Sequence, residues 1–368
     1  SNFTFFLNDS IRGDEIEQTD NRNIFGYSGT VQKDFNIKNS VLHATIGVGS
    51  RNDLTNISLK HAEKRVTLDT IVSGKVYQQN TNAFVDLTFD INKHFSINTG
   101  TRLDFFQFNF KENRYDSLSG NKLKFRASPK LNFYYTVNDK LQFFLKSGIG
   151  FHSNDARSVV VNKVNNVLPK AYGAEIGTEF KLFNRVLVNA AFWSLYLESE
   201  LVYIGDEGTV ETNTPTNRFG VDLSVRYQII KNLFADVDFN YNYGRLVGMP
   251  KGENFIPLAP RITSTGGITY KHDKGFNASV RYRYIDSRPA NENNSVTAKG
   301  YFLLDLVAAY KIKHFEFGVS AENLLNTKWN QAQFDTESRL PGEANPVSEL
   351  HFTPGTPFYL KGTFAYRF

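Results

Sequence analysis

Apolar and polar residues alternate along most of the chain with a period of two. Between Leu123 and Tyr135 the apolar residues share one face, and Lys, Arg, Ser and Asn residues share the other. The same pattern runs through residues 233–243 and 276–284. Because successive side chains point to opposite faces of a strand, this period predicts β-strands with one apolar and one polar face. Several stretches exceed ten residues, whereas strands of soluble proteins have about five or six.

The alternation predicts sixteen strands. Short polar turns, such as Asn138-Asp139-Lys140 and His272-Asp273-Lys274, alternate with longer connections. The expected strands are 2–9, 20–34, 39–52, 76–91, 93–112, 119–138, 140–153, 169–182, 184–203, 208–230, 232–246, 257–271, 274–289, 298–312, 314–325 and 356–368. The longer connections are expected near residues 10–19, 53–75, 154–168, 247–256, 290–297 and 326–355.

Short turns at one end of the strands and long loops at the other are typical of outer-membrane barrels. A charged face that persists in strand after strand fits a hydrated interior, and the apolar face fits lipid. We therefore predict an all-β protein, a transmembrane antiparallel up-and-down β-barrel with about 16 strands, over residues 1–368. A soluble sandwich with buried apolar faces is the alternative that alternation alone leaves open.

Composition excludes several function classes. The chain has no Cys, which excludes disulfide frameworks, thiolate metal sites and Cys nucleophiles. Its longest apolar run, Leu306–Tyr310, has five residues, far fewer than the roughly 20 that a spanning helix needs. The net charge of +5 is spread along the chain without a basic run, so nucleic-acid binding is not expected.

Catalytic and metal-binding patterns are missing from the sequence. The seven His residues are scattered, and no H-E-x-x-H motif or close His pair occurs. We expect no enzyme activity, no cofactor and no metal site.

The last predicted strand carries aromatic residues at alternate positions and ends on one. Tyr366 and Phe368 close this series. The arrangement resembles the C-terminal signal that the barrel-assembly machinery of Gram-negative bacteria reads. We therefore expect that machinery to be a partner, and the bacterial outer membrane to be the location of a multi-pass β-barrel.

Four segments between residue 150 and the C-terminus resemble TonB-dependent outer-membrane transporters. They are Gly150–Arg157, the I-P-x-x-P segment Ile256–Arg261, the E-N-L-L-N segment Ala321–Trp329, and the closing strand from Pro354 to Phe368. They occur in the order in which the family has them, and residues 1–150 resemble the family only as barrel strands. The resemblance implies active uptake of a scarce solute, such as a ferric siderophore, another metal chelate or an oligosaccharide, energised through TonB.

The chain also differs from that family. Such transporters have a 22-stranded barrel with an N-terminal plug domain, and no plug-like segment or TonB-contacting segment is expected in this chain. We interpret it as the C-terminal portion of such a barrel. A further polypeptide or missing segment would then supply the plug, which contacts the TonB complex, and the N-terminal strands. A complete, passive 16-stranded porin is the alternative function. Outer-membrane lipid and lipopolysaccharide are the expected surroundings.

Solute binding is expected in the long loops, where guanidinium and amide donors accompany aromatic surfaces. This combination suits anionic chelates or oligosaccharides. The candidate substrate-binding residues are Asn154, Asp155, Arg157, Arg288, Asn291, Gln331, Gln333, Phe334 and Arg339.

Overall fold

The computed structural model describes residues 2–6, 14–154, 156–161, 167–199, 201–204, 209–212, 214–338, 343–345 and 347–368. Strands account for nearly all of the regular structure, with one short α-helix and one 3-10 turn. The strands are β1 Asn2–Phe6, β2 Asp14–Ile37, β3 Ser40–Glu63, β4 Val66–Asp90, β5 Phe95–Glu112, β6 Gly120–Asn138, β7 Leu141–Phe151, β8 Lys170–Leu182, β9 Val186–Leu197, β10 Leu201–Ile204, β11 Thr209–Thr212, β12 Thr216–Ile230, β13 Leu233–Leu246, β14 Ile262–Lys271, β15 Phe276–Ile285, β16 Arg288–Pro289, β17 Thr297–Ala298, β18 Tyr301–Ile312, β19 Phe315–Glu322, β20 Asn330–Ser338, β21 Val347–Pro354 and β22 Tyr359–Tyr366; the helices are η1 Asp116–Leu118 and α1 Ala156–Val161.

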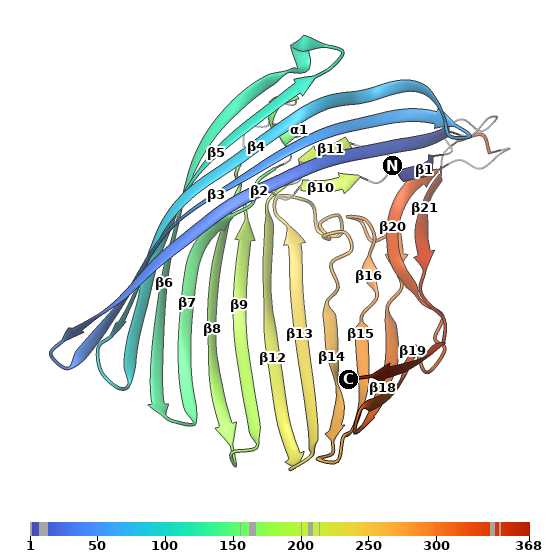
Figure 1. The fold of residues 1–368 in the computed structure, drawn as a ribbon. Helices are drawn as coiled ribbons and strands as arrows, with labels where there is room; N and C mark the ends of the chain where they lie inside the picture. The colour runs from blue at the N-terminus through green and yellow to red at the C-terminus, as the bar shows by residue number, and fades with distance from the viewer. Residues whose placement is uncertain are drawn as a thin grey trace.

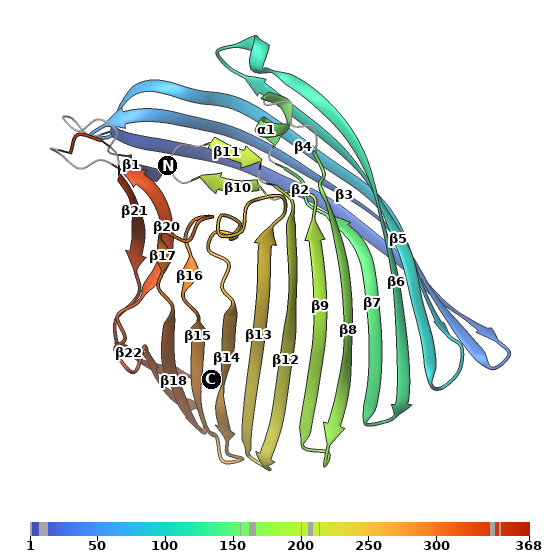
Figure 2. The ribbon, with the colours of Figure 1, turned by 180° about the vertical axis from the view of Figure 1, so that it is seen from behind.

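Sixteen of these strands form one curved sheet in up-and-down order (Figures 1 and 2). The order is β1 to β9, then β12 to β15, β18, β19 and β22, and neighbouring strands pair antiparallel. Three small hairpins, β10–β11, β16–β17 and β20–β21, extend the connections at one end. The predicted fold class, a transmembrane antiparallel barrel with about 16 strands, is confirmed.

The apolar faces of the strands point outward. Phe125, Ile176 and Phe192 expose 58%, 58% and 52% of their surface. In a β-sandwich these side chains would be packed between two sheets, whereas a barrel turns them toward lipid. The soluble alternative is therefore wrong. No helix in the described part of the chain is long and apolar enough to cross a membrane.

The outward face of β5 shows where the apolar belt ends. Its outward positions from Phe95 to Phe105 are Phe, Ile, Thr and Leu, and Phe105 is paired with Phe125 of β6. Gln107, Asn109 and Lys111 follow on the same face. Ten strand residues span about 33 Å, close to the hydrocarbon thickness of a bilayer. The upper part of β5 therefore lies outside the membrane.

Strands β2, β3 and β4 extend far beyond that belt. They have 24, 24 and 25 residues, or about 80 Å each at the usual rise. In both views they run obliquely to β7–β15 and reach the end where the long connections lie (Figures 1 and 2). These strands build a wall of the extracellular vestibule.

This extension corrects the predicted loop at 53–75. That segment is the upper half of β3 and β4, joined at Lys64 and Arg65, whose φ angles are 48° and 66°. Outside the membrane both faces of a strand meet water, so the apolar stripe disappears although the backbone pairing continues.

Other boundaries also differ from the prediction. β2 begins at Asp14 and not near residue 20, the expected strand 208–230 is divided into β11 and β12, and β14 begins at Ile262 and not at 257. The expected loop 326–355 contains the β20–β21 hairpin, and α1 lies in the loop 154–168. The sequence did not predict these elements because they are short or polar and carry no long alternating pattern.

Candidate functional site

Charged side chains line the inner face of the sheet and pair across neighbouring strands. Lys146 Nζ lies 3.2 Å from Glu175 Oε1, Arg226 Nη2 lies 2.8 Å from Asp238 Oδ2, and Arg283 pairs with Asp305 at 3.1 Å. A hollow of about 630 Å³ lies against this wall between β6 and β14. The interior is therefore wet and cross-linked by charge, as predicted for a barrel lumen. Among the described residues, no group of three or more His, Cys, Asp or Glu could hold a metal ion.

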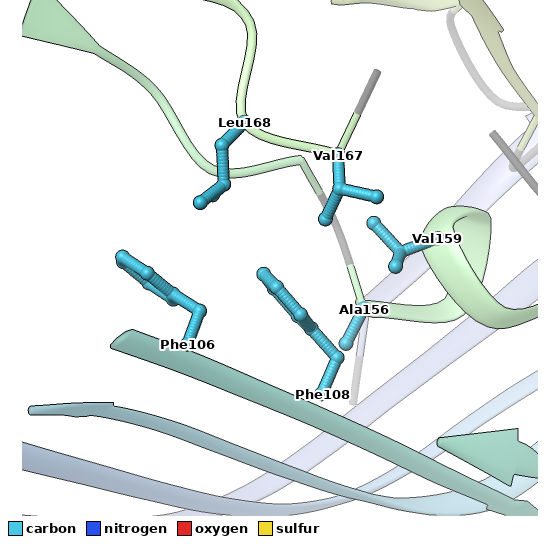
Figure 3. Packing of buried hydrophobic residues seen from close by; sticks show 6 residues of the cluster. All are labelled: Phe106, Phe108, Ala156, Val159, Val167 and Leu168. Atoms are coloured by element: carbon cyan, nitrogen blue, oxygen red, sulfur yellow. The ribbon is translucent and has the colours of Figure 1, made fainter. Parts of the chain in front are cut away.

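The loop after β7 folds inward onto the upper part of β5. Ala156, Val159, Val167 and Leu168 pack against the inner face of β5, where Phe106 and Phe108 stack with their ring centroids 5.6 Å apart (Figure 3). Phe106, Phe108 and Phe110 occupy successive positions on the inner face of β5 above the membrane, so this apolar patch needs a cover. The loop provides it and becomes a fixed part of the vestibule wall.

A polar cavity of about 610 Å³ lies beside this loop. It is bounded by the inner faces of β2 to β5 and by Ser153 and Asn154. Arg22, Arg51 and Arg102 reach it from three different strands, and Asp53 holds the first two: Arg22 Nε donates to Asp53 Oδ1 at 2.7 Å, and Arg51 Nη2 lies 3.6 Å from Asp53 Oδ2. Arg22 and Arg51 hold the pKa of Asp53 below its ordinary value, and the largest cause is the hydrogen bond from Arg22.

The third arginine is held by a fully buried carboxylate. Arg102 Nε donates to both oxygens of Asp104, at 3.1 and 2.9 Å, and Asn80 Nδ2 donates to Oδ1 at 3.0 Å. Asp104 exposes none of its surface, whereas the Arg102 side chain exposes 49%. The buried carboxylate therefore orients a guanidinium whose other side is open to the cavity.

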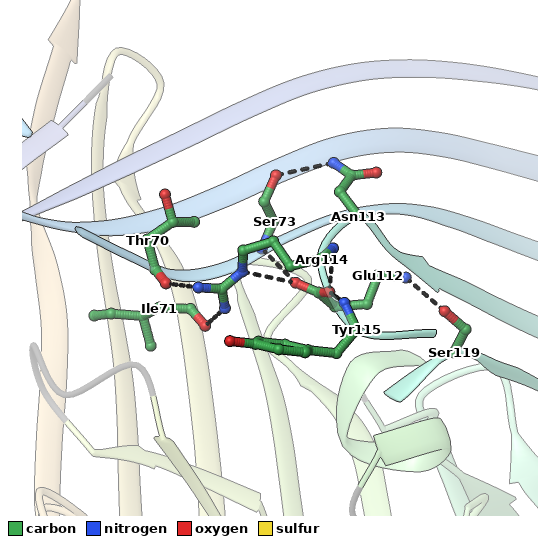
Figure 4. A network of polar contacts seen from close by, with 8 residues as sticks. All are labelled: Thr70, Ile71, Ser73, Glu112, Asn113, Arg114, Tyr115 and Ser119. Carbon is green, nitrogen blue, oxygen red and sulfur yellow. Dashed lines mark hydrogen bonds and ion pairs between the residues drawn. The ribbon is translucent and has the colours of Figure 1, made fainter. Parts of the chain in front are cut away.

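A second polar network holds the tip of the β5–β6 hairpin (Figure 4). The Glu112 carboxylate accepts hydrogen bonds from the backbone N–H groups of Ser73, Arg114 and Tyr115, and from Arg114 Nε. The Arg114 guanidinium also donates to the carbonyls of Thr70 and Ile71. One buried carboxylate thus ties the hairpin to β4.

This network predicts a pH dependence. Burial raises the pKa of Glu112, but the backbone N–H groups of Tyr115, Arg114 and Ser73 and the Arg114 side chain outweigh it, so the pKa lies below the ordinary 4.5. A lowered pKa means that the charged carboxylate stabilises the fold fully above pH 4.5 and loses this effect as the pH falls through the folded-state value. We expect E112Q to lower the unfolding free energy at pH 7 by about 1.5–3 kcal/mol.

The measurement is the unfolding temperature of the full-length protein and of E112Q between pH 7 and pH 3. The difference between the two proteins should shrink below pH 4.5. A difference that stays constant over this range would contradict the assignment.

The structure places the candidate residues of the β7–β8 loop as follows. Asn154 is buried, lines the cavity described above and donates its backbone N–H to the carbonyl of Val167 at 3.2 Å. Asp155 lies outside the described residues. Arg157 belongs to α1, and its side chain lies outside the described part.

The remaining candidates lie in the β15–β18 and β19–β22 connections. Asn291 Nδ2 donates to Asp335 Oδ2 at 2.8 Å, and Gln333, buried, exchanges two hydrogen bonds with the backbone of Lys299 at 2.9 and 2.8 Å. These amides join the two connections to each other. Gln331 is exposed on β20, Phe334 packs 6.3 Å from the His351 ring, and Arg339 lies outside the described residues.

Arg288 is a buried candidate cation. It exposes 8% of its surface, and its Nη1 has no hydrogen-bond partner among the described residues. Burial lowers the pKa of this guanidinium. At the other end of the sheet, Tyr366 closes β22 and its ring meets that of Phe368 edge to face at 5.2 Å. Their role as an assembly signal stays a prediction.

Sequence reasoning missed Arg22, Arg51 and Arg102. All three fall on the lumen side of strands that the prediction ended too early or treated as ordinary barrel wall. Counting polar residues on both faces of the segment 50–63 could have indicated a strand that leaves the membrane.

A wide antiparallel sheet with a lipid-facing apolar belt, a charged lumen and a vestibule built by long strands defines an outer-membrane β-barrel receptor wall. The chain matches the family model "TonB dependent receptor-like, beta-barrel" over residues 1–324 and belongs to that family. This membership places it in the bacterial outer membrane. No curated protein matches the sequence.

Solved structures share the fold at low sequence identity. The unliganded ferric citrate transporter FecA has a TM-score of 0.75 and 13% identity, with 99% of this chain and 57% of that chain covered. The ferric yersiniabactin uptake receptor FyuA from Yersinia pestis has a TM-score of 0.74 and 13% identity, with 100% of this chain and 57% of that chain covered. The ferric-catecholate import receptor Fiu from Escherichia coli K12 has a TM-score of 0.72 and 15% identity, with 96% of this chain and 55% of that chain covered. The chain thus spans between 55% and 57% of the length of these structures.

Proposed function

We propose that this chain forms part of the barrel wall of an outer-membrane transporter that takes up a scarce solute and is energised through TonB. The observation that carries the proposal is the family match over residues 1–324. The solute would be a ferric siderophore, another metal chelate or an oligosaccharide, and the protein would bind and move it without chemical change. The named ligands of FecA, FyuA and Fiu support the iron chelates within this group.

The sheet edges support a contribution from outside this chain. Among the described residues, β1 and β22 each have one neighbouring strand and do not pair with each other. Unpaired backbone groups in lipid cost several kcal/mol each, so a membrane barrel must close. We propose that further strands complete a 22-stranded barrel, together with a plug that contacts the TonB complex.

Binding is proposed at the extracellular end of the lumen. The candidate loop residues Asn154, Arg288, Asn291 and Gln333 lie in connections at that end. Of the candidates that the structure describes, Asn154 also lines the 610 Å³ cavity.

The test is growth and solute uptake by the source bacterium. Deleting the gene should abolish growth on one limiting nutrient, with ferric chelates tried first, and deleting TonB should have the same effect on that uptake. Passive diffusion predicts uptake that persists without TonB, and this result would favour the porin alternative.

A further inference from the structure

Strand β6 presents four cations to the lumen, three of them at successive inward positions and the fourth beyond Ser128. Its nineteen residues contain Lys122, Lys124, Arg126 and Lys130 and no Asp or Glu. All four have even numbers, and the odd positions carry the outward apolar residues such as Leu123 and Phe125, which are 55% and 58% exposed. The four cations therefore share the inner face of one strand, and the next strand adds Lys146 without an acid.

The series runs from the vestibule into the membrane-spanning part of the lumen. Lys124 lies opposite Phe106 of β5, and Lys130 lies opposite Gly100. A strand rises about 3.3 Å per residue, so Lys122 and Lys130 are separated by about 26 Å. Above the apolar belt, burial and, to a smaller extent, the neighbouring Lys124 lower the pKa of Lys122.

Acidic partners in the described part of the chain neutralise the lower end. Lys130 forms an ion pair with Asp86, and Lys146 forms one with Glu175. Arg126 Nη2 donates to the carbonyl of Leu168, while its buried Nε has no hydrogen-bond partner in the described part of the chain. Within that part, neither Lys124 nor Arg126 has a carboxylate within 4.0 Å. Both side chains are partly exposed, and a bound anion would supply the missing counter-charge.

The upper end of the series meets the arginine cavity. Phe106 lines the cavity and pairs with Lys124, and Arg102, which reaches the cavity, pairs with Ser128 of β6. The cavity lining holds three Arg residues and one Asp, Asp53. The amides of Gln78, Asn80 and Asn82 complete the lining. The arginine cavity and the cations of β6 are therefore adjacent through the pairing of β5 with β6.

We propose that the arginine cavity and the inner face of β6 form one binding track for a solute that carries several carboxylate or phosphate groups. This assignment rests on the proposed transport function and narrows its substrate class to polyanions. Arg22, Arg51 and Arg102 would receive the solute at the extracellular end. Lys124 and Arg126, whose charges lack acidic partners, would bind its anionic groups next.

The test measures binding to the purified full-length protein in detergent at low ionic strength by calorimetry. The probes are citrate for carboxylates, inositol hexakisphosphate for phosphates and maltohexaose as a neutral solute. The variant K124Q/R126Q should bind the preferred anion about tenfold more weakly and lose part of the salt dependence. Comparing the two anions distinguishes a carboxylate solute from a phosphate solute.

The matched control is K75Q/K111Q. These two lysines are exposed and paired with each other on the outward faces of β4 and β5, so the variant makes the same change in net charge away from the lumen. Its anion affinity should be unchanged, and heat-modifiable gel mobility should show that both variants are folded.

Three results would overturn the proposal: no anion binding by the unaltered protein, equal weakening in both variants, or binding of maltohexaose alone. Unchanged anion binding by K124Q/R126Q together with a lower unfolding temperature would also overturn the proposal, because the two cations would then stabilise the fold and not bind the solute. Failure of TonB-dependent uptake would refute the transport function but leave this binding measurement unaffected.

Discussion

Replacing Asp104 with Ala should destabilise the full-length protein by about 1.5–3 kcal/mol, because it removes charged hydrogen bonds to Arg102 and Asn80 while water can still reach the half-exposed Arg102. Asp104 is fully buried and accepts three hydrogen bonds from Arg102 and one from Asn80. The free guanidinium would then move away from its place at the cavity. Urea-induced unfolding in lipid vesicles measures the loss of stability. Weaker anion binding would show that the Arg102 guanidinium has left the cavity.

The control for this substitution is D273A. Asp273 pairs with Lys231 at 3.0 Å in turns between strands, but both side chains are largely exposed, at 71% and 83%. Exposed pairs contribute about 0–1 kcal/mol. A D104A protein as stable as D273A would mean that the buried carboxylate does not hold the vestibule wall together.

Replacing Phe108 with Ala should release the inward-folded loop. The Phe108 ring is fully buried between β5 and the residues Val159, Val167 and Leu168 (Figure 3). Truncating a buried Phe costs about 3–5 kcal/mol, through lost burial and the cavity left behind. Because Phe108 lies at the centre of the cluster that holds the described part of the loop, we expect local opening, seen as faster protease cleavage between residues 152 and 169, before the barrel itself unfolds.

The matched control is F183A. Phe183 lies in the β8–β9 turn with 88% of its surface exposed, so its truncation should change stability by no more than about 0.5 kcal/mol. Equal protease sensitivity of F108A and the unaltered protein would show that other contacts hold the loop in place.

The fold was predictable where lipid constrains the sequence. In β6 and β15 every outward position must be apolar and every inward one compatible with water, so the period of two is visible for ten residues or more. The same rule fails above the membrane. There the upper halves of β3 and β4 meet no lipid, and their residues resemble a loop until backbone pairing is seen.

The candidate site was predictable only in part. The loops that contain Asn154, Arg288, Asn291 and Gln333 could be located from their polar composition, but not the contacts of those side chains. Asn291 and Gln333 bond to neighbouring connections about 34 to 44 residues away in sequence, and no local pattern encodes such distances. The convergence of Arg22, Arg51 and Arg102 depends on the register of four strands.

The amino-acid sequence by itself determined that this protein is an antiparallel barrel with lipid outside and charge inside, because each strand must satisfy two solvents at once. Only the tertiary structure decided which charges meet, how far the strands rise above the bilayer and which loop folds inward. Those features depend on strand register and on packing between distant segments, and these interactions leave no periodic trace along the chain.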